Sequence, residues 1–259
     1  MNDKSGSGKK LTALFESGNT RLHFALWDGS AVSGVKNVAY PSEEKELGHI
    51  LRELVAGIPF EGAAACSVSN RWKNPLLRSL HEMFPGRLHI VRTPADIPVE
   101  VDYDDPVAIG VDRVLAAYAA YAVAGGSCVV VDAGTAVTVD AVGQNGTLLG
   151  GFIFPGLDVI GSCLSSVTDL PVVKPSVTCA EIGHGTISCM ANAATVGFTA
   201  AIEGLIRHAF KEIGENKTVV ITGGGGQVLK SILPFETTER PYLTLEGLGR
   251  VADILPLYR

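Results

Sequence analysis

The sequence predicts an α/β protein made of two similar domains, and two observations support this prediction. First, a pattern of apolar strand, acidic residue, glycine and second strand occurs at residues 12–30 and again at 128–146. Second, segments typical of strands and of helices occur along the whole chain, whose 259 residues suffice for one large core or two modest ones. Because the two copies lie far apart, they indicate two similar domains and not a solenoid, whose repeats are contiguous.

The second copy carries the clearer pattern. Its apolar, β-branched residues 129–131 are typical of a buried strand, which ends at Asp132. Gly134 supplies a turn, and residues 135–140 form a second predicted strand. The hairpin tip therefore offers a carboxylate for a cation, and a hydroxyl and backbone N–H groups for phosphate oxygens. Taken alone, the pattern fits an ordinary tight hairpin equally well, because Asp and Gly are common turn residues.

The first copy aligns with the second without a gap in the strand and at the tip. The aligned pairs are Glu16 with Asp132, Gly18 with Gly134 and Asn19 with Thr135. The turns at the far ends, Asp28-Gly29 and Asn145-Gly146, are one position out of step. Two such tips, facing each other across a cleft, would be able to hold the phosphates of a nucleotide.

The other elements follow from apolar periodicity and from turn residues. Ser42 is the predicted N-cap of a helix that ends near Val55. The remaining predicted strands are 11–16, 21–27, 62–69, 87–92, 147–154, 217–221 and 242–245, and the remaining predicted helices are 74–84, 109–123, 157–167, 186–213 and 246–257.

Two of these helices and one loop contain candidate functional residues. Asp112 lies in the first turn of helix 109–123, where the helix dipole alone accounts for a carboxylate, and Arg113 fits a solvated surface charge. Helix 186–213 is rich in Ala and Gly, which permits close packing against another element. Loop 222–226 contains four glycines, which suit either a flat contact with a base or a tight turn.

Composition excludes several classes of function. A net charge of −6 argues against binding nucleic acid or an anionic membrane, and no apolar run is expected to span a bilayer. The five cysteines include no C-x-x-C pair and lie mostly among small or apolar residues, so we expect buried thiols in a reducing cytoplasm. The histidines lack metal-ligand spacing, which argues against zinc.

The first ten residues are polar and rich in Ser and Gly, and no signal peptide is expected among them. Ser7-Gly8-Lys9-Lys10 fails as a phosphate loop, because Asp3 and Lys10 stand where the motif requires Gly and Ser or Thr. We therefore predict a disordered leader at 1–10, an N-terminal domain at 11–121 and a C-terminal domain at 122–259.

Several short motifs, in this order and spacing, resemble those of the type III pantothenate kinases, a branch of the actin-like ATPase, sugar kinase and Hsp70 superfamily. The resemblance runs from about Leu11 to the end of the chain. The motifs are S-G-N-T-R (17–21), Y-D-D-P-V-A-I-G-V-D-R (103–113), D-A-G-T-A-V-T-V-D (132–140), G-G-F-I-F-P-G (150–156), the threonine of G-H-G-T (183–186) and T-G-G (222–224).

The resemblance implies two RNase H-like domains, each with a mixed β-sheet flanked by helices, and an active site in the cleft between them. It implies ATP-dependent phosphorylation of pantothenate to 4′-phosphopantothenate, the first step of coenzyme A synthesis. One alternative is a relative that binds a nucleotide or ligand and acts as a regulator. Another is a kinase of the same superfamily for a different hydroxyl compound, which the Y-x-x-P-x-x-x-G-x-D-R string disfavours.

The resemblance also implies roles for individual residues. Asp112 would be the catalytic base, and Arg113 would pair with the substrate carboxylate. Asp132 would hold a monovalent cation, K⁺ or NH₄⁺, beside ATP with Mg²⁺. The implied pantothenate-binding residues are Tyr103, Gly110, Val111, Asp112, Arg113 and Thr186, and the implied ATP-binding residues are Glu16, Ser17, Gly18, Asn19, Thr20, Arg21, Thr135, Gly223 and Gly224.

Two further features belong to the resemblance. The helix at 186–213 would help to build a homodimer whose pocket draws on both subunits. The family's first phosphate turn begins with Asp, as D-x-G-N-T, whereas this chain has Glu16, whose side chain is longer by one methylene group. A longer side chain moves the carboxylate by about one C–C bond, in a kind of site that tolerates shifts of roughly 0.5 Å.

Overall fold

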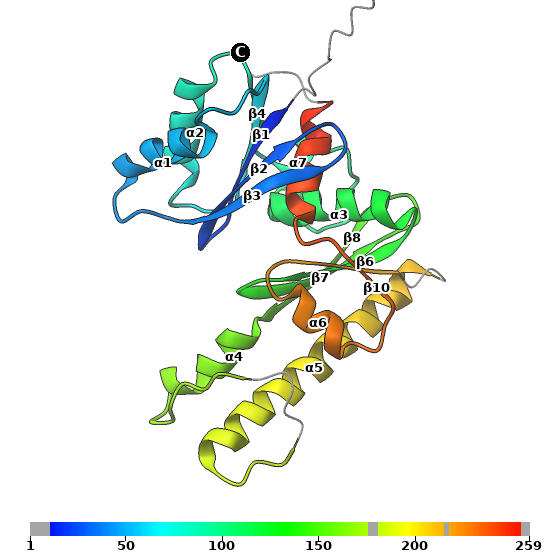
Figure 1. Cartoon of the computed structure of the whole chain (residues 1–259). Helices are drawn as coiled ribbons and strands as arrows, with labels where there is room; N and C mark the ends of the chain where they lie inside the picture. Colours follow the sequence, from blue (N-terminus) through cyan, green and yellow to red (C-terminus); the bar gives the residue numbers. More distant parts are fainter. Residues whose placement is uncertain (1–10, 176–180, 215–217, 255–259) are drawn as a thin grey trace, which may run out of the picture. The chain divides into compact units, whose positions relative to one another are not determined.

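The computed structural model describes residues 11–175, 181–214 and 218–254. Contacts divide them into two compact units, and each unit is described by itself. The first unit contains residues 11–98, 105–119 and 244–254, and the second contains 99–104 and the described residues of 120–243. Each unit has a five-stranded sheet (Figure 1). The predicted boundary between an N-terminal domain at 11–121 and a C-terminal domain at 122–259 was based on the sequence repeat, and it stays a prediction.

The first sheet has the strand order β3-β2-β1-β4-β5. The first three strands form an antiparallel meander, and β1, β4 and β5 run parallel to one another. The bounds are β1 (Thr12–Ser17), β2 (Arg21–Trp27), β3 (Val32–Ala39), β4 (Gly62–Ser67) and β5 (Leu88–Val91). Strand β3 was not predicted, because as an exposed edge strand it lacks a continuous apolar face.

The second sheet has the order β10-β9-β6-β7-β8, with β6, β7 and β8 antiparallel and β6, β9 and β10 parallel. Strand for strand, this is the arrangement of the first sheet. The sequence repeat therefore corresponds to a repeat of topology, and the predicted α/β fold with two mixed sheets is confirmed. The bounds are β6 (Cys128–Ala133), β7 (Ala136–Val142), β8 (Leu148–Pro155), β9 (Val219–Thr222) and β10 (Thr237–Glu239).

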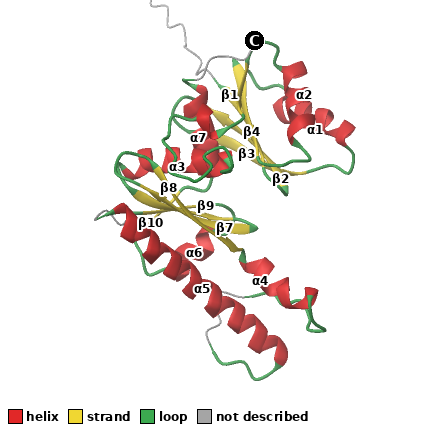
Figure 2. Ribbon diagram, turned by 180° about the vertical axis from the view of Figure 1, so that it is seen from behind, coloured by secondary structure: helices red, strands yellow, loops and turns green. Residues whose placement is uncertain are grey.

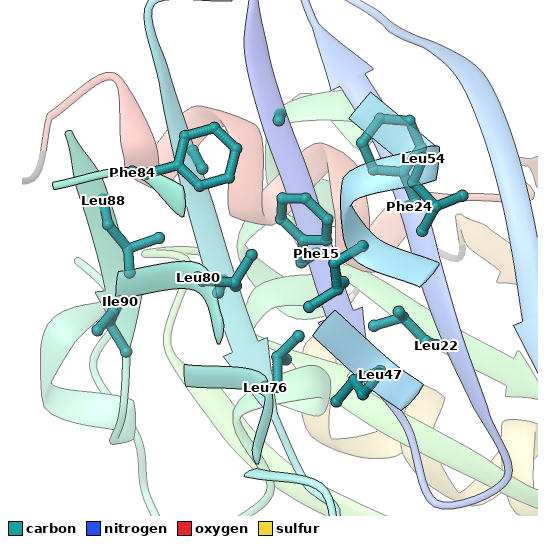
Figure 3. Packing of buried hydrophobic residues seen from close by; sticks show 14 of the residues in the cluster. Phe15, Leu22, Phe24, Leu47, Leu54, Leu76, Leu80, Phe84, Leu88 and Ile90 are labelled. Carbon is teal, nitrogen blue, oxygen red and sulfur yellow. The ribbon is translucent and has the colours of Figure 1, made fainter. Parts of the chain in front are cut away.

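Two helices, α1 (Leu47–Val55) and α2 (Lys73–Met83), cover one face of the first sheet. Their leucines are buried against Phe15 and Phe24 of the sheet (Figure 3). Helix α3 (Val111–Ala124) begins in this unit, and α7 (Leu243–Ala252) packs against it. The backbones approach so closely that a Cβ atom at Gly247 would lie 2.8 Å from the carbonyl carbon of Leu115. The chain thus returns to the first unit at its C-terminal end.

The second sheet packs against α4 (Leu157–Cys163), α5 (Thr186–Ile213) and α6 (Gly226–Ile232). Helix α5 buries Phe198, Ile202 and Ile206 against the sheet, and Gly214 ends it with φ 82°. Figures 1 and 2 show that the first turns of α5 extend beyond the strands. Three short 3-10 helices complete the described elements: η1 (Glu44–Glu46), η2 (Pro94–Asp96) and η3 (Leu164–Ser166).

The structure corrects some local predictions. Ser42 is not an N-cap, because a 3-10 turn capped by Glu43, without a side-chain hydrogen bond, precedes α1. Residues 242–245 are not a strand: Leu243 begins α7, and a short apolar run without flanking context fits either element. Among the described cysteines, Cys66 and Cys128 are buried thiols as predicted, whereas Cys163 and Cys189 are exposed. Cys179 lies outside the described residues.

The expectation that no apolar run reaches the length of a membrane span was wrong for α5. Within the described part of the chain, this helix alone passes the test of length and composition. Core helices of soluble proteins pass the same test, and α5 contributes Phe198, Ile202 and Ile206 to the core of the second unit. Ile187 and Val196, in its first half, are exposed.

Candidate active site

The first hairpin tip lies between β1 and β2. Gly18 closes it by donating its N–H to the carbonyl of Arg21 at 3.0 Å, so that Asn19 and Thr20 project at the tip. Glu16 stands one residue before the end of β1, paired with His23 on β2 and with Cys66 on β4. The second tip, between β6 and β7, is one residue shorter than the first. This difference contributes to the one-position offset between the far-end turns of the two sequence copies.

Tyr40 holds the first tip in place. Its hydroxyl donates to the carbonyl of Gly18 at 2.9 Å and lies 2.7 Å from Ser17 Oγ. Its ring stacks on Trp72, with centroids 4.6 Å apart and planes 6° apart, and Trp72 is itself buried. Burial raises the pKa of Tyr40, so the hydroxyl remains protonated and able to donate. Nothing in the sequence singled out this residue, because a lone tyrosine before Pro41 matches no motif.

If the first tip binds ATP, as the resemblance implies, Tyr40→Phe should raise the KM for ATP about three- to tenfold, because the variant loses one or two hydrogen bonds of ordinary strength that hold the tip. The phenyl ring keeps its stack on Trp72, so the fold should persist. Steady-state kinetics with each substrate varied in turn measure the effect, and the KM for the acceptor should not change.

The matched control for this variant is Tyr121→Phe. Tyr121 belongs to the second unit, where it donates its hydroxyl to the carbonyl of Gln144 at 2.7 Å, whereas the first tip belongs to the first unit. It removes the same kind of bond and should leave the KM for ATP unchanged. Equal values of this KM in the two variants would mean that Tyr40 contributes only to stability.

Asp112 lies in the first turn of α3, near the first tip. Its Oδ1 accepts a hydrogen bond from the backbone N–H of Arg113 at 2.8 Å. Burial raises the pKa of Asp112, and the Arg113 N–H and guanidinium partly oppose this rise. Both Glu16 and Asp112 are close enough to Cys66 to add to the effect of burial, which raises the pKa of that thiol. The first unit therefore brings the two predicted acidic residues together around one buried cysteine.

The loop after β4 joins these two parts. The N–H of Val68 donates to the carbonyl of Ser17 at 3.0 Å, and its Cγ1 lies 3.7 Å from the position that a Cβ of Gly110 would take. Val68 thus contacts both the first tip and the residues before Asp112. The prediction of sites overlooked this loop, because Ser-Val-Ser-Asn reads only as the end of a strand.

The second tip is surrounded by glycines. Gly223 has φ +83°, and a Cβ atom there would overlap Asp132 Oδ1 and lie 2.7 Å from the carbonyl oxygen of Ala133. Gly225 donates its N–H to that same carbonyl at 2.9 Å. The loop 222–226 therefore lies directly against Asp132.

A third segment reaches the second tip from the end of β8. Gly156 donates its N–H to the carbonyl of Thr135 at 2.9 Å, and a Cβ atom at Gly156 would lie 2.6 Å from the same oxygen. Only glycine permits this approach. Pro155 and Gly156 end one of the motifs quoted above, and that motif was the signal in the sequence for this contact.

The second tip has the chemistry of a site for phosphate and a cation. Thr135 and Gly134 are exposed, and Asp132 is partly buried beside them. No group of three or more His, Cys, Asp or Glu side chains that could hold a metal occurs in the described ranges. A cation here would therefore take Asp132 as one ligand and complete its shell with phosphate oxygens and water, which is usual for Mg²⁺ bound to nucleotides.

Two predicted substrate residues lie elsewhere in the second unit. Tyr103 is 37% exposed, and its ring lies 3.9 Å from the position that a Cβ of Gly150 would take. The preceding residue, Asp102, donates its backbone N–H to the carbonyl of Leu148 at 2.8 Å. Thr186 is exposed at the start of α5, in the turns that extend beyond the sheet.

Comparison with known proteins points to one family. The family model described as type III pantothenate kinase matches residues 13–208. A type III pantothenate kinase from Akkermansia muciniphila is 32% identical over 242 residues, which cover 93% of this chain and 98% of the relative. Another from Salinispora arenicola is 29% identical over 243 residues, covering 91% of this chain and 96% of the relative.

Solved structures show the same fold at lower identity. A Campylobacter jejuni protein described as a Baf family transcriptional activator is 21% identical with a TM-score of 0.61, covering 93% of this chain and 97% of the other. The ethanolamine utilization protein EutJ from Carboxydothermus hydrogenoformans is 16% identical, with a TM-score of 0.56 and coverage of 94% and 90%. An acetate kinase from Porphyromonas gingivalis is 11% identical, with a TM-score of 0.54 and coverage of 86% of each chain. These similarities establish the fold alone.

Proposed function

This chain belongs to the type III pantothenate kinase family, and on that premise we propose that it transfers the terminal phosphoryl group of ATP to the hydroxymethyl oxygen of pantothenate. The product would be 4′-phosphopantothenate, for coenzyme A synthesis in the cytoplasm. The observation that carries the proposal is Asp112: a carboxylate with a raised pKa, in the same unit as the Glu16 tip.

On the acceptor side, Asp112 would take the proton of the attacking hydroxyl. A carboxylate suits this role when burial moves its pKa toward the working pH, because it then holds the proton more strongly while still being ionised. Gly110, Val111 and Arg113 flank it at the start of α3, and Tyr103 with Thr186 would complete the pantothenate pocket. Transfer of a phosphoryl group depends mainly on position and on neutralising charge, so one base is sufficient.

On the donor side, the two hairpin tips would hold the phosphates of ATP. The first would contribute Ser17, Gly18, Asn19, Thr20 and Arg21, with Glu16 directed at the Mg²⁺-phosphate unit. The second would contribute Thr135 and the adjacent Gly223 and Gly224. Asp132 would bind K⁺ or NH₄⁺, and the cation would supply positive charge beside the phosphate oxygens.

The test is an ADP-release assay on the purified chain with pantothenate and Mg²⁺-ATP, in buffers containing Na⁺, K⁺ or NH₄⁺, with mass analysis of the product. We expect a gain of one phosphate on pantothenate, and faster turnover with K⁺ or NH₄⁺ than with Na⁺. Binding of ATP without any turnover would instead support the second candidate, a ligand-binding regulator. Equal rates in Na⁺ and K⁺ would refute the monovalent site only.

Glu16 provides a separate prediction. Because its side chain is one methylene longer than Asp, it would hold the metal–phosphate unit less well, and magnesium requires near-ideal octahedral geometry. We expect Glu16→Asp to lower the KM for ATP by about two- to fivefold. The shorter side chain removes the displacement of the carboxylate, in a kind of site that tolerates shifts of only roughly 0.5 Å. An unchanged or higher KM would mean that the backbone around the first tip already compensates for the extra length.

We further propose a homodimer formed through the first half of α5. The apolar side chains of Ile187 and Val196 are exposed there, and the Cβ position of Gly197 has no atom within 4 Å. Such a surface accommodates a second helix at short distance.

For the oligomer, we expect light scattering to give about twice the 27.1 kDa mass of the chain at micromolar concentration. Gly197→Arg should shift the protein to a monomer without unfolding it, because Gly197 is exposed and a Cβ atom there would meet no atom within 4 Å. A wild-type monomer would refute the proposal, and so would a dimer that Gly197→Arg leaves intact.

A further inference from the structure

The short segment before Tyr103 is paired with β8, the edge strand of the second sheet. Two backbone hydrogen bonds of 2.8 Å join them. The N–H of Asp102 donates to the carbonyl of Leu148, and the N–H of Leu148 donates to the carbonyl of Glu100. A parallel β-bridge between Val101 and Leu148 accompanies these bonds. The backbone that leads into Tyr103 is therefore anchored to one place on β8.

Strand β8 is irregular at this place. Ala141 of β7 opposes Gly150. The next residue of β7, Val142, opposes Leu148, so one residue of β8 is left without a partner on β7. Gly150 has φ +108°, a conformation that residues with a side chain rarely adopt. Such β-bulges bend a strand and re-aim side chains, and they are frequent beside active sites.

The ring of Tyr103 lies beside this bulge. Its Cδ2 is 3.9 Å from the position that a Cβ of Gly150 would take, and the carbonyl oxygen of Asp102 is 4.0 Å from the same position. Glycine therefore offers the ring a patch of bare backbone. Tyr103 is 37% exposed, so part of its surface is accessible to solvent.

The residues that hold Tyr103 differ from those that hold Asp112, although both belong to the string 103–113. Contacts assign Tyr103 to the second unit and Asp112 to the first, with the division between Asp104 and Asp105. The position of the Tyr103 backbone is consequently set by β8 and not by the helix that carries Asp112.

We propose that the bulge of β8 positions Tyr103 for the acceptor, with Gly150 as a positioning residue that acts through the tyrosine ring. The proposal rests on the proposed function, because it takes pantothenate as the acceptor that Tyr103 contacts. A ring that is already held in place needs no ordering when the acceptor binds, which strengthens binding. This gives a function to the first glycine of the string G-G-F-I-F-P-G.

The experiment compares Gly150→Ala with Gly146→Ala, its matched control. Gly146 has φ +80° in the turn between β7 and β8, and a Cβ atom there would lie 3.4 Å from the ring of Tyr121. Both variants therefore strain a glycine of positive φ next to a tyrosine in the same hairpin, but only Gly150 lies beside Tyr103.

We expect Gly150→Ala to raise the KM for pantothenate about three- to tenfold, the usual range for residues coupled through one contact. The kcat should stay within about threefold and the KM for ATP should not change, because the ring would contact the acceptor equally in the ground and transition states. Gly146→Ala should keep all three values. Equal values of the KM for pantothenate in the two variants would overturn the inference.

A second pair of variants tests the anchor. Asp102→Pro removes the N–H that donates to the carbonyl of Leu148, whereas Asp102→Ala keeps it, and both remove the carboxylate. We expect the KM for pantothenate to be at least about threefold higher in the proline variant than in the alanine variant. Equal values would contradict the anchor. If thermal unfolding shows that Gly150→Ala does not fold, this pair decides the question.

The variant Tyr103→Ala shows whether Gly150 acts through the ring. In that background, Gly150→Ala should change the KM for pantothenate by less than about twofold, because no ring remains to be positioned. The same factor in both backgrounds would mean that Gly150 affects the KM by another route, and the inference would be wrong.

Amide hydrogen exchange at Asp102 provides a readout that does not depend on activity. Exchange should be faster in Gly150→Ala than in wild type, and unchanged in Gly146→Ala, because local opening follows the loss of the anchor. If wild type neither binds pantothenate in a calorimetric titration nor phosphorylates it, the proposed function fails. The role of Tyr103 toward the acceptor then fails with it, whereas the exchange rates still test the anchor by itself.

Discussion

Asp112→Asn is expected to lower kcat by about 10²- to 10⁴-fold, the usual contribution of a general base. Asparagine keeps the size of the side chain and can still accept the hydrogen bond from the Arg113 N–H, so the start of α3 should be preserved. The KM for ATP should change little, because Asp112 would act on the acceptor. Steady-state kinetics with wild type as reference measure the effect, and a variant that retains more than about a tenth of the wild-type kcat would rule out the assigned role.

The same variant has an expected effect on stability, of opposite sign to its effect on rate. Since burial raises the folded-state pKa of Asp112 above its ordinary value of 3.8, the folded protein holds that proton to higher pH than the unfolded chain does. This contribution to stability is present at low pH and is lost as pH rises from the unfolded to the folded pKa. At neutral pH, the buried charge therefore costs stability, and Asp112→Asn should unfold at the same temperature as wild type or higher.

The pH dependence of the wild-type rate provides a second measurement. The base must be ionised to act, so kcat/KM should fall on the acid side with a midpoint above the ordinary Asp value. This acid limb should be absent from the residual activity of Asp112→Asn. An acid limb that is the same in both forms would assign the titration to another group.

Gly223→Ala is expected to reduce kcat/KM for ATP by at least about 10²-fold and to destabilise the second unit. The φ of +83° disfavours any residue with a Cβ atom, and that atom would overlap Asp132 Oδ1. To relieve the overlap, either the loop or the carboxylate must move by more than the roughly 0.5 Å that such sites tolerate. Kinetics with ATP varied and thermal unfolding measure the two effects.

The neighbouring glycine offers a matched control. A Cβ atom at Gly224 would meet nothing within 4 Å, and this residue does not have a positive φ. Gly224 would meet the phosphates through its backbone, which alanine keeps, so Gly224→Ala should preserve the fold and most of the activity. If both variants behaved alike, contact between this loop and Asp132 would not be required for the reaction. A fully active Gly223→Ala would exclude the loop from the ATP site.

Much of the fold could be predicted from the sequence, for local physical reasons. The strands that flank each tip are either continuously apolar or alternate apolar with polar residues. The acid–glycine pair at each tip is a short-range signal for a turn. The bounds of α5 at Thr186 and Ile213 were predicted correctly because its composition is uniform and Gly214 supplies a clear end. The repeat of the tip was also visible in the sequence, and the structure extends it to the order and direction of all five strands in each sheet.

Other features depended on contacts between residues far apart in the chain. Leu243 and Leu245 belong to a helix and not a strand, because α7 packs against Leu115 and Trp27 of the first unit, which are distant in sequence. A short apolar run takes its conformation from such neighbours, since its own propensities are weak.

The sequence by itself determined the family, the repeated acid–glycine tips and the identity of Asp112 as the candidate base, because all of these are carried by short contiguous strings. Only the tertiary structure showed that Tyr40, which follows β3, donates a hydrogen bond to the first tip. It also showed that Gly223 lies directly against Asp132, and that Lys73 and Arg92 line one cavity together with Gly110. The physical reason is distance along the chain. Hydrogen bonds, close packing and charge act over a few ångströms in space, and residues 17 and 40, 132 and 223, or 73 and 110 become neighbours only when the chain has folded.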